Sequence, residues 1–323
     1  MALYLVTGGA GFIGSHLVEA LTARGDRARV LDNLSSGRLE NLGSGVGGVG
    51  SGATVEFLEG DITDAGACRE AAKGCDGVFH EAAQVSVPRS VEDPELSYEI
   101  NVMGTLRVLE AARAAGIERL VFAASSAAYG ESERLPKVED FPTAPMSPYA
   151  SGKVAGEELL GVWGRCYGMR TVCLRYFNVF GPRQVDDSPY TGVIAIFARI
   201  LLEGGTPTIN GDGEQTRDLT FVDNVVEANL AAMGAEVPPG TVVNVGGGER
   251  ITINELYRAM AERLGGPAEP HHGPDRAGDV RHSLASLDRA RELLGWEPRV
   301  GWREGLERTL DWYRDRLGAR GPA

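Results

Sequence analysis

A glycine-rich turn near the start of the sequence constrains the fold of this chain more than any other feature. A short apolar run leads into Thr7-Gly8-Gly9-Ala10-Gly11-Phe12-Ile13-Gly14, and a helical pattern follows it. Gly8 permits a tight turn, Gly11 lets the backbone approach a pyrophosphate, and Gly14 lets a helix pack closely against a strand. The start of that helix offers free N–H groups and the positive end of the helix dipole to phosphates. A strand, this turn and a helix in succession predict a dinucleotide-binding βαβ unit.

The rest of the first half repeats this alternation. Short β-branched apolar runs are separated by longer helical patterns such as Ile13–Ala23 and Val102–Ala115. Such alternation is typical of a parallel sheet with helices on both faces. We therefore expect an α/β fold, a doubly wound parallel (Rossmann) sheet with a smaller C-terminal substrate-binding domain. The expected strands are Leu3–Val6, Arg27–Leu31, Val55–Leu58, Gly77–His80, Leu120–Ala123 and Val172–Leu174.

A change of rhythm after Arg175 indicates where the first domain ends. Long loops rich in Gly, Pro and Asp follow, and loops of this length in a compact protein tend to be functional. We expect a cofactor-binding domain over residues 1–176 and a substrate-binding domain over residues 177–323, with segments near 215–248 returning to the first domain.

Residues 43–53 form a separate feature, with six glycines and two serines in eleven residues. We expect a flexible surface insertion in which nothing packs.

An acidic residue at the end of the second expected strand bears on the choice of cofactor. Asp32 lies 18 residues beyond Gly14. A carboxylate there bonds the ribose 2′-OH and repels a 2′-phosphate, so the pattern favours NAD over NADP, although Arg38 is close in sequence. Asp61 and Ile62 follow the third expected strand and are candidates to lie beside the adenine.

A tyrosine and a lysine four residues apart are the first candidate catalytic pair. Ser147 and Pro148 resemble a helix start, so Tyr149 and Lys153 share one helix face. An ammonium beside a phenol favours the phenolate, and we expect it to lower the pKa of Tyr149 enough for use as a base.

With these motifs in place, the chain resembles the extended short-chain dehydrogenase/reductase family, and within it the UDP-hexose 4-epimerases, including those that act on N-acetylated sugars. The matching segments span nearly the whole sequence: Thr7–Gly14, Asp32–Leu34, Asp61-Ile62, His80–Ala83, Asn101, Ser125–Gly130, Tyr149 with Lys153, Leu174–Asn178, Arg217-Asp218 and Arg276–Asp279.

The resemblance implies a role for further residues. Ser125 joins Tyr149 and Lys153 as the catalytic trio, with Ser126 as the alternative if the register shifts. The implied NAD contacts are Gly8, Gly11, Phe12, Ile13, Asp32, Asn33, Asp61, Ile62, Ala82, Ala83, Gln84, Asn101, Tyr149, Lys153 and Tyr176. The implied UDP-sugar contacts are Ser86, Ser125, Tyr149, Asn178, Val193, Thr208, Asn210, Arg217, Arg276, Asp279 and Ser283.

Related enzymes that also begin by oxidising the sugar at C4 carry different residues directly after the catalytic serine. Dehydratases of this family carry Asp-Glu there, and decarboxylating members carry a Glu, whereas this chain has Ser126 and Ala127. An enzyme for an acidic sugar should offer a cation, but Arg183 is followed by the acidic segment 185–187. We expect 4-epimerisation of UDP-glucose or UDP-galactose. A UDP-glucuronate epimerase, a dehydratase, a reductase that releases its cofactor and a non-catalytic NAD-binding regulator remain as alternatives.

Ser283, four residues beyond Asp279, bears on the choice of sugar. Similar enzymes restricted to non-acetylated sugars carry a bulky Tyr at this position, so we also expect activity on UDP-GlcNAc and UDP-GalNAc.

Composition limits the partners of the chain. Its formal net charge is −13, which argues against a general nucleic-acid or anionic-membrane surface. No apolar run approaches the roughly 18 residues of a membrane helix. The four cysteines form no CxxC pair, so we expect reduced thiols, no bound metal and a cytoplasmic location. The stretches Tyr98–Ala115 and Tyr149–Tyr167 resemble helices that pair as a four-helix bundle in family dimers, so we expect a homodimer.

Overall fold

An eight-stranded, fully parallel sheet forms the larger part of the molecule, in the order β12-β7-β6-β5-β1-β2-β4-β3. The structure is a computed structural model and describes residues 1–184, 192–274 and 280–318. All six expected strands are present, each within a few residues of its expected bounds. The strands are β1 (Leu3–Thr7), β2 (Arg27–Asp32), β3 (Val46–Gly48), β4 (Val55–Glu59), β5 (Gly77–His80), β6 (Arg119–Ser125), β7 (Arg170–Tyr176) and β12 (Thr241–Val245).

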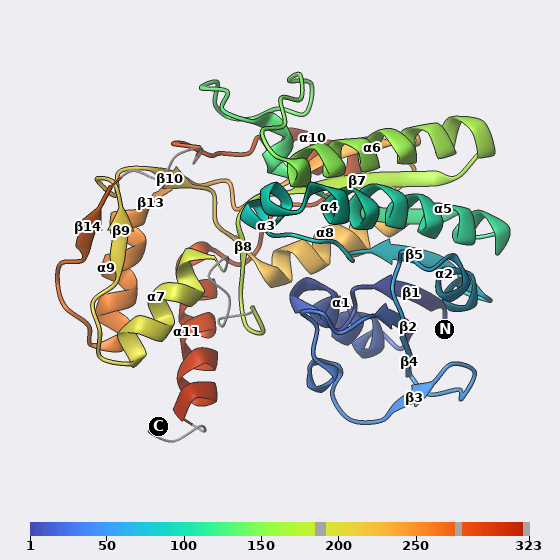
Figure 1. Cartoon of the computed structure of the whole chain (residues 1–323), viewed down its shortest axis with the longest axis horizontal. Helices are drawn as coiled ribbons and strands as arrows, with labels where there is room; N and C mark the ends of the chain where they lie inside the picture. Colours follow the sequence, from blue (N-terminus) through green and yellow to red (C-terminus); the bar gives the residue numbers. More distant parts are fainter. Residues whose placement is uncertain (185–191, 275–279, 319–323) are drawn as a thin grey trace.

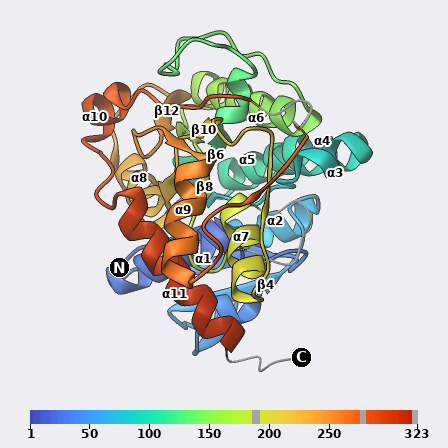
Figure 2. The same ribbon diagram turned by 90° about the vertical axis from the view of Figure 1, so that its left-hand side faces the viewer.

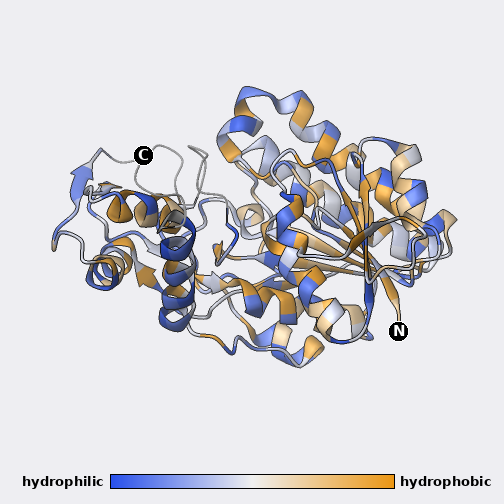
Figure 3. Cartoon of the chain, turned by 90° about the horizontal axis from the view of Figure 1, so that it is seen from below, coloured by the Kyte–Doolittle hydropathy of each residue, from blue (hydrophilic) through white to orange (hydrophobic). Residues whose placement is uncertain are grey.

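Helices cover both faces of the sheet (Figure 1), which confirms the doubly wound α/β fold. One face carries α1 (Phe12–Ala23), α8 (Val222–Gly234) and α10 (Asp288–Leu294). The other carries α2 (Ala65–Ala72), α5 (Thr105–Ala114) and α6 (Pro148–Tyr167). The strands are mostly apolar, and the helices turn polar faces outward (Figure 3), as expected for a sheet buried on both sides.

Several short helical segments connect the main strands and helices. The segment α3 (Val87–Glu92) and α4 (Pro94–Tyr98) leads through the π-helical turn η2 (Glu99–Gly104) directly into α5. Two 3₁₀ turns, η1 (Leu39–Leu42) and η3 (Ser126–Tyr129), follow β2 and β6.

The helix α6 begins where the sequence predicts it. Ser147 Oγ accepts a hydrogen bond from the Ala150 N–H, Pro148 occupies the first turn, and Gly168 ends the helix in the left-handed region. This start fixes the position of the side chains in the first two turns.

A C-terminal lobe packs beside the carboxyl ends of the strands (Figures 1 and 2). Its apolar core lies between α7 (Val193–Leu202), α9 (Ile253–Leu264) and α11 (Trp302–Gly318). Three short strand pairs complete it: β9 (Thr208–Asn210) with β14 (His271–Gly273), β10 (Thr216–Arg217) with β13 (Ile251–Thr252), and β8 (Val179–Phe180) with β11 (Thr220–Phe221). Between these segments the chain returns to the main sheet, where β12 pairs with β7.

The glycine-rich segment 43–53 differs from the expectation that nothing in it packs. Val46–Gly48 pairs in parallel with β4 as the edge strand, and Val46 packs against the core beneath it. A single valine among the glycines, Val46, is enough to give this short strand an apolar contact.

No helix within the described residues is long and apolar enough to cross a membrane.

Candidate active site

The glycine turn between β1 and α1 has the geometry that a pyrophosphate requires. Gly8 has a φ of +68°, and a Cβ on it would lie 2.8 Å from the backbone of Ala82. A Cβ on Gly14 would lie 2.2 Å from the Gly8 carbonyl oxygen. No side chain caps the start of α1 at Gly11, so the N–H groups of Phe12 and Ile13 begin an uncapped helix end. These residues therefore fit a dinucleotide pyrophosphate.

Asp32 ends β2 beside this turn. Its carboxylate accepts hydrogen bonds from the Ala10 N–H at 3.0 Å and the Leu34 N–H at 2.8 Å. Burial raises the pKa of Asp32, and the N–H groups partly oppose that rise. Next to it, Asn33 Nδ2 donates to Asp61 Oδ2 at 2.6 Å. A carboxylate, an amide and a second carboxylate thus stand together at the carboxyl ends of β2 and β4, which suits the hydroxyl groups of an adenosine ribose.

The loop after β5 carries the next expected cofactor residues. Gln84 N–H donates to Asn101 Oδ1 at 2.9 Å, and Asn101 Nδ2 donates back to the Gln84 carbonyl at 3.0 Å. Both residues are buried, so η2 is tied to the loop that contains Ala82 and Ala83. Ile62 contacts Gly104 at the other end of η2, and Ser86 caps α3 through its hydroxyl.

The expected catalytic trio meets at the carboxyl end of β6. Ser125 is the last residue of β6, and its hydroxyl is hydrogen-bonded with Tyr149 of α6. Lys153, one turn further along α6, is 3% exposed and donates from Nζ to the Ala123 carbonyl at 2.7 Å. The alternative, Ser126, begins η3, one residue beyond the end of β6.

The charge states of Tyr149 and Lys153 differ from the expectation. Burial raises the pKa of Tyr149, and only the hydrogen bond from Ser125 opposes it. Burial also lowers the pKa of Lys153 to about 8, against the attraction of Glu81 and Glu157. The prediction that Lys153 lowers the pKa of Tyr149 is therefore wrong for the chain by itself, because the ammonium points to the Ala123 carbonyl and burial dominates.

A buried hydrogen-bond chain beside this trio was missed by the sequence analysis. Tyr176 Oη donates to Glu81 Oε1 at 2.8 Å and accepts from Asn229 Nδ2 at 2.7 Å. Burial raises the pKa of Glu81 to about 7. Glu81 directly follows β5. Its carboxyl group lies in a run of apolar and small residues, and this is the one sequence feature that could have indicated a buried acid here.

The expected sugar and diphosphate residues lie around the junction with the C-terminal lobe. Asn178, with a φ of 25°, donates to the Asp218 carbonyl at 3.1 Å. The fully buried carboxylate of Asp218 accepts from the N–H groups of Gly247, Gly248 and Ala285. Asp218 therefore ties together the loops that carry the neighbouring Arg217 and the partly buried Ser283.

The remaining expected contacts lie further out. Thr208 and Asn210 are exposed on β9, and Val193 begins α7. Arg276 and Asp279 lie outside the described residues.

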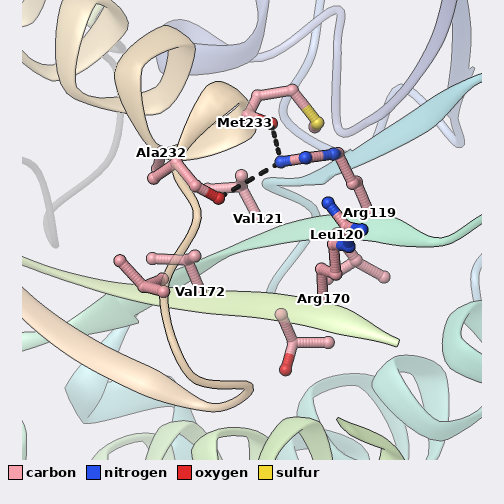
Figure 4. A pocket seen from close by; sticks show the side chains of 10 residues that line it. Arg119, Leu120, Val121, Arg170, Val172, Ala232 and Met233 are labelled. Atoms are coloured by element: carbon pink, nitrogen blue, oxygen red, sulfur yellow. Dashed lines mark hydrogen bonds between the residues drawn. The ribbon is translucent and has the colours of Figure 1, made fainter. Parts of the chain in front are cut away.

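A small pocket at the opposite edge of the sheet does not belong to this site. It is lined by Arg119 and Arg170, at the amino ends of β6 and β7, and by the end of α8 (Figure 4). Arg119 Nη1 donates there to the carbonyls of Met233 and Ala235, and these hydrogen bonds attach the C-terminal end of α8 to β6. Within the part of the chain that the structure describes, no group of three His, Cys, Asp or Glu residues could hold a metal ion.

Comparison with known proteins places this geometry in a family. A UDP-glucose 4-epimerase of Mycolicibacterium smegmatis is 45% identical over 97% of this chain and 98% of its own. The crystal structure of the Thermotoga maritima UDP-glucose 4-epimerase with UDP-glucose superposes with a TM-score of 0.91, at 40% identity over 98% of this chain and 99% of that one. A UDP-N-acetylglucosamine 4-epimerase from Methanobrevibacter ruminantium, in complex with UDP-N-acetylmuramic acid, also gives 0.91, at 36% identity over 98% and 99%. Residues 4–246 match the NAD dependent epimerase/dehydratase family, and the chain belongs to that family.

Proposed function

We propose that the chain is an NAD-dependent 4-epimerase of UDP-hexoses. The observation that carries this proposal is the meeting of Ser125, Tyr149 and Lys153 at the end of β6, beside a glycine turn shaped for a dinucleotide. Two of the three relatives named above are UDP-glucose 4-epimerases, which supports UDP-glucose and its 4-epimer, UDP-galactose, as substrates.

Tyr149, Ser125 and Lys153 have separate roles in the proposed reaction. NAD, when bound, supplies the acceptor for the C4 hydride and returns it, so it is not consumed. Tyr149, as phenolate, takes the proton of the sugar 4-OH, and Ser125 holds the 4-oxygen by a hydrogen bond. With NAD and substrate bound, Lys153 would supply a positive charge that favours the phenolate, an effect that it does not have in the chain by itself. The 4-keto sugar would then turn while its diphosphate stays bound. Hydride would return to the other face of C4, and Tyr149 would give its proton back to the 4-oxygen, which regenerates the phenolate.

Two features oppose the alternative reactions. Ser126 and Ala127 supply no carboxyl group next to the trio, which a dehydratase needs. Arg183, the cation that an acidic sugar would need, donates instead to Glu19 at 2.5 Å and Ser15 at 3.4 Å on α1. The presence of Ser125, Tyr149 and Lys153 together argues against a non-catalytic regulator, because a protein that only binds NAD does not need these three side chains.

Ser283 supports a wider choice of sugar. Its N–H donates to the Thr216 carbonyl at 3.2 Å, which holds a small side chain beside Arg217. A hydroxymethyl group leaves room for a 2-acetamido substituent, so the enzyme also accepts UDP-GlcNAc and UDP-GalNAc.

The proposal includes a homodimer in the cytoplasm. Tyr98, Met103, Val162 and Tyr167 leave apolar surface exposed on α4, η2 and α6. A second copy of the same face would cover it as a four-helix bundle formed with α5 and α6. The four free cysteines fit a reducing compartment.

The test is an NMR assay of the purified protein, without added cofactor, incubated separately with UDP-glucose and UDP-GlcNAc. Galacto-configured products from both support 4-epimerisation with retained NAD and the wider specificity. Conversion of UDP-glucose alone contradicts the Ser283 argument. No conversion of either, in protein that carries NAD, contradicts the proposed function.

Ser283→Tyr tests the choice of sugar directly. The phenol ring fills the space meant for the acetamido group, so turnover of UDP-GlcNAc should fall by at least about tenfold, since a steric misfit of about 1–3 kcal/mol is typical. Turnover of UDP-glucose should stay within about twofold to threefold of the parent, because this sugar has no acetamido group to clash with the ring. Equal loss on both sugars would contradict the pocket argument.

A further inference from the structure

Four basic residues lie near Thr216 in the C-terminal lobe. Arg217, Arg250 and His282 contact it with their side chains, and Arg281 contacts it through its backbone carbonyl. Thr216 Oγ1 lies 3.3 Å from Arg250 Nε, which donates to it, and 3.0 Å from His282 Nδ1. Arg217 Nη1 donates to the carbonyls of Thr216 and Arg281. We call Arg217, Arg250, Arg281 and His282 the cation cluster. Its members come from β10, from the turn before β13 and from the segment after residue 280, so only the folded chain brings them together.

His282 is the one member of this cluster that can change its charge near neutral pH. Partial burial and then the positive charges of Arg250, Arg281 and Arg217 lower the pKa of His282. Asp212 acts in the opposite direction, but Arg281 Nη2 already holds it at 2.7 Å. In the chain by itself the neighbours of this imidazole are mainly cations, and they favour its neutral form.

The position of the cluster points to an anion. The backbone around His282 is tied to Thr216 on both sides, by Thr216 N–H to the Arg281 carbonyl and by Ser283 N–H to the Thr216 carbonyl. His282 thus stands between Arg217, an expected diphosphate contact, and Ser283, an expected sugar contact. Three arginines and a histidine gathered in this way attract an anion, and two phosphate charges among them would be stabilised.

We propose that His282 is a further residue of the diphosphate site and takes up one proton from solvent when a nucleoside diphosphate sugar binds. This inference rests on the proposed function, which supplies the ligand. Thr216 Oγ1 has a lone pair left after accepting from Arg250, so a protonated Nδ1 can donate to it while Nε2–H faces the anion.

The experiment measures UDP-glucose affinity by isothermal titration calorimetry between about pH 6 and about pH 8. The protein is the full chain with its NAD, in a Tyr149→Phe background that prevents turnover. UDP-glucose is the probe because its diphosphate diester does not titrate in this range. The affinity should rise as the pH falls, by up to about tenfold per pH unit, and the heat should depend on the buffer because a proton is taken up.

Two variants locate the proton. His282→Asn should remove the pH dependence, and His282→Lys should give affinity that is tight and independent of pH, because its charge is permanent. His271→Asn, an exposed histidine on β14, serves as the matched control and should keep the dependence. A flat profile in the parent, or a sloping profile in either His282 variant, would overturn the inference. Absence of UDP-glucose binding in the parent would instead contradict the proposed function.

Discussion

Tyr149 and Lys153 both place their reactive atoms in a buried region at the end of β6, and burial favours the neutral form of each. The pKa of Tyr149 rises and that of Lys153 falls to about 8. Neither shift by itself favours a phenolate. The phenolate must therefore depend on the charges that surround the pair when substrate and cofactor are present, and on Ser125, which already lowers the pKa of the phenol in the chain by itself.

Tyr149→Phe should reduce 4-epimerisation by at least about a hundredfold, because a phenyl ring cannot exchange the proton of the 4-OH. NAD should remain bound, since the glycine turn and Asp32 are untouched. Turnover is followed by NMR, and NAD content by absorbance after denaturation. Tyr167→Phe, at the exposed end of the same helix, is the matched control and should keep its activity. Near-normal turnover of Tyr149→Phe would contradict the role of the phenol.

Glu81→Gln tests the buried carboxyl group next to the trio. Because burial raises the pKa of Glu81 to about 7, the folded chain holds a proton that the unfolded chain releases, and the free energy of unfolding falls as the pH rises through this range. Glutamine has no such proton. Relative to the parent, the variant should gain on the order of 2 kcal/mol between about pH 5 and about pH 8, since one pKa unit is about 1.4 kcal/mol.

Denaturant unfolding of the two proteins at several pH values measures this difference. Glu158→Gln, an exposed change on α6, should give a difference that does not vary with pH. A difference of constant size for Glu81→Gln would show that Glu81 is already ionised in the folded chain.

At this scale, the sequence predicted what depends on near neighbours in the chain. Ser147 as the helix cap, and Tyr149 and Lys153 on one helix face, follow from spacing. The contacts Tyr176–Glu81 and Lys153–Ala123 join residues from different strands and helices, so no spacing rule finds them. The shift in the pKa of Tyr149 was missed for the same reason, because burial is a property of the folded chain.

The element that matters most for the cofactor is α1, since its first turn packs on the glycine turn. Gly14→Ala would place a methyl group 2.2 Å from the Gly8 carbonyl, so the helix would have to shift. We expect the free energy of unfolding to fall by roughly 1–3 kcal/mol and the NAD content of the purified protein to drop.

Chemical denaturation and NAD content measure both effects. Gly234→Ala, at the end of α8 with no atom within 4 Å of the new methyl group, is the matched control. It should be neutral or more stable by up to about 1 kcal/mol. Equal stability of the two variants would contradict the packing argument.

Element prediction succeeded where a periodic pattern was long enough to see. The six expected strands and α6 carry runs of several apolar or regularly spaced residues. The pairs β8–β11 and β10–β13 have two residues in each strand, too few for any period. The edge strand Val46–Gly48 was missed because its glycines obscured the one valine, Val46, that packs against the core.

The proposed dimer concerns the whole molecule. Val162 is 38% exposed on α6, and a charge there would be buried against the second copy. Val162→Glu should shift the protein from two chains to one in light scattering after size-exclusion chromatography. Leu39→Glu, an exposed apolar residue on η1, is the matched control and should leave the mass unchanged. A parent protein that elutes as a single chain would contradict the proposed dimer.

Because β12 comes late in the sequence, the main sheet is completed late during synthesis of the chain. The glycine turn and the trio are complete in sequence by Lys153, but the sheet lacks its edge beside β7 until Thr241–Val245 has been made. Trp296, later still, belongs to the same apolar core as α1 and β1. A nascent chain on the ribosome therefore carries an exposed β7 edge while most of the C-terminal lobe is still being translated. The chain's need for protection from aggregation should be greatest in that interval.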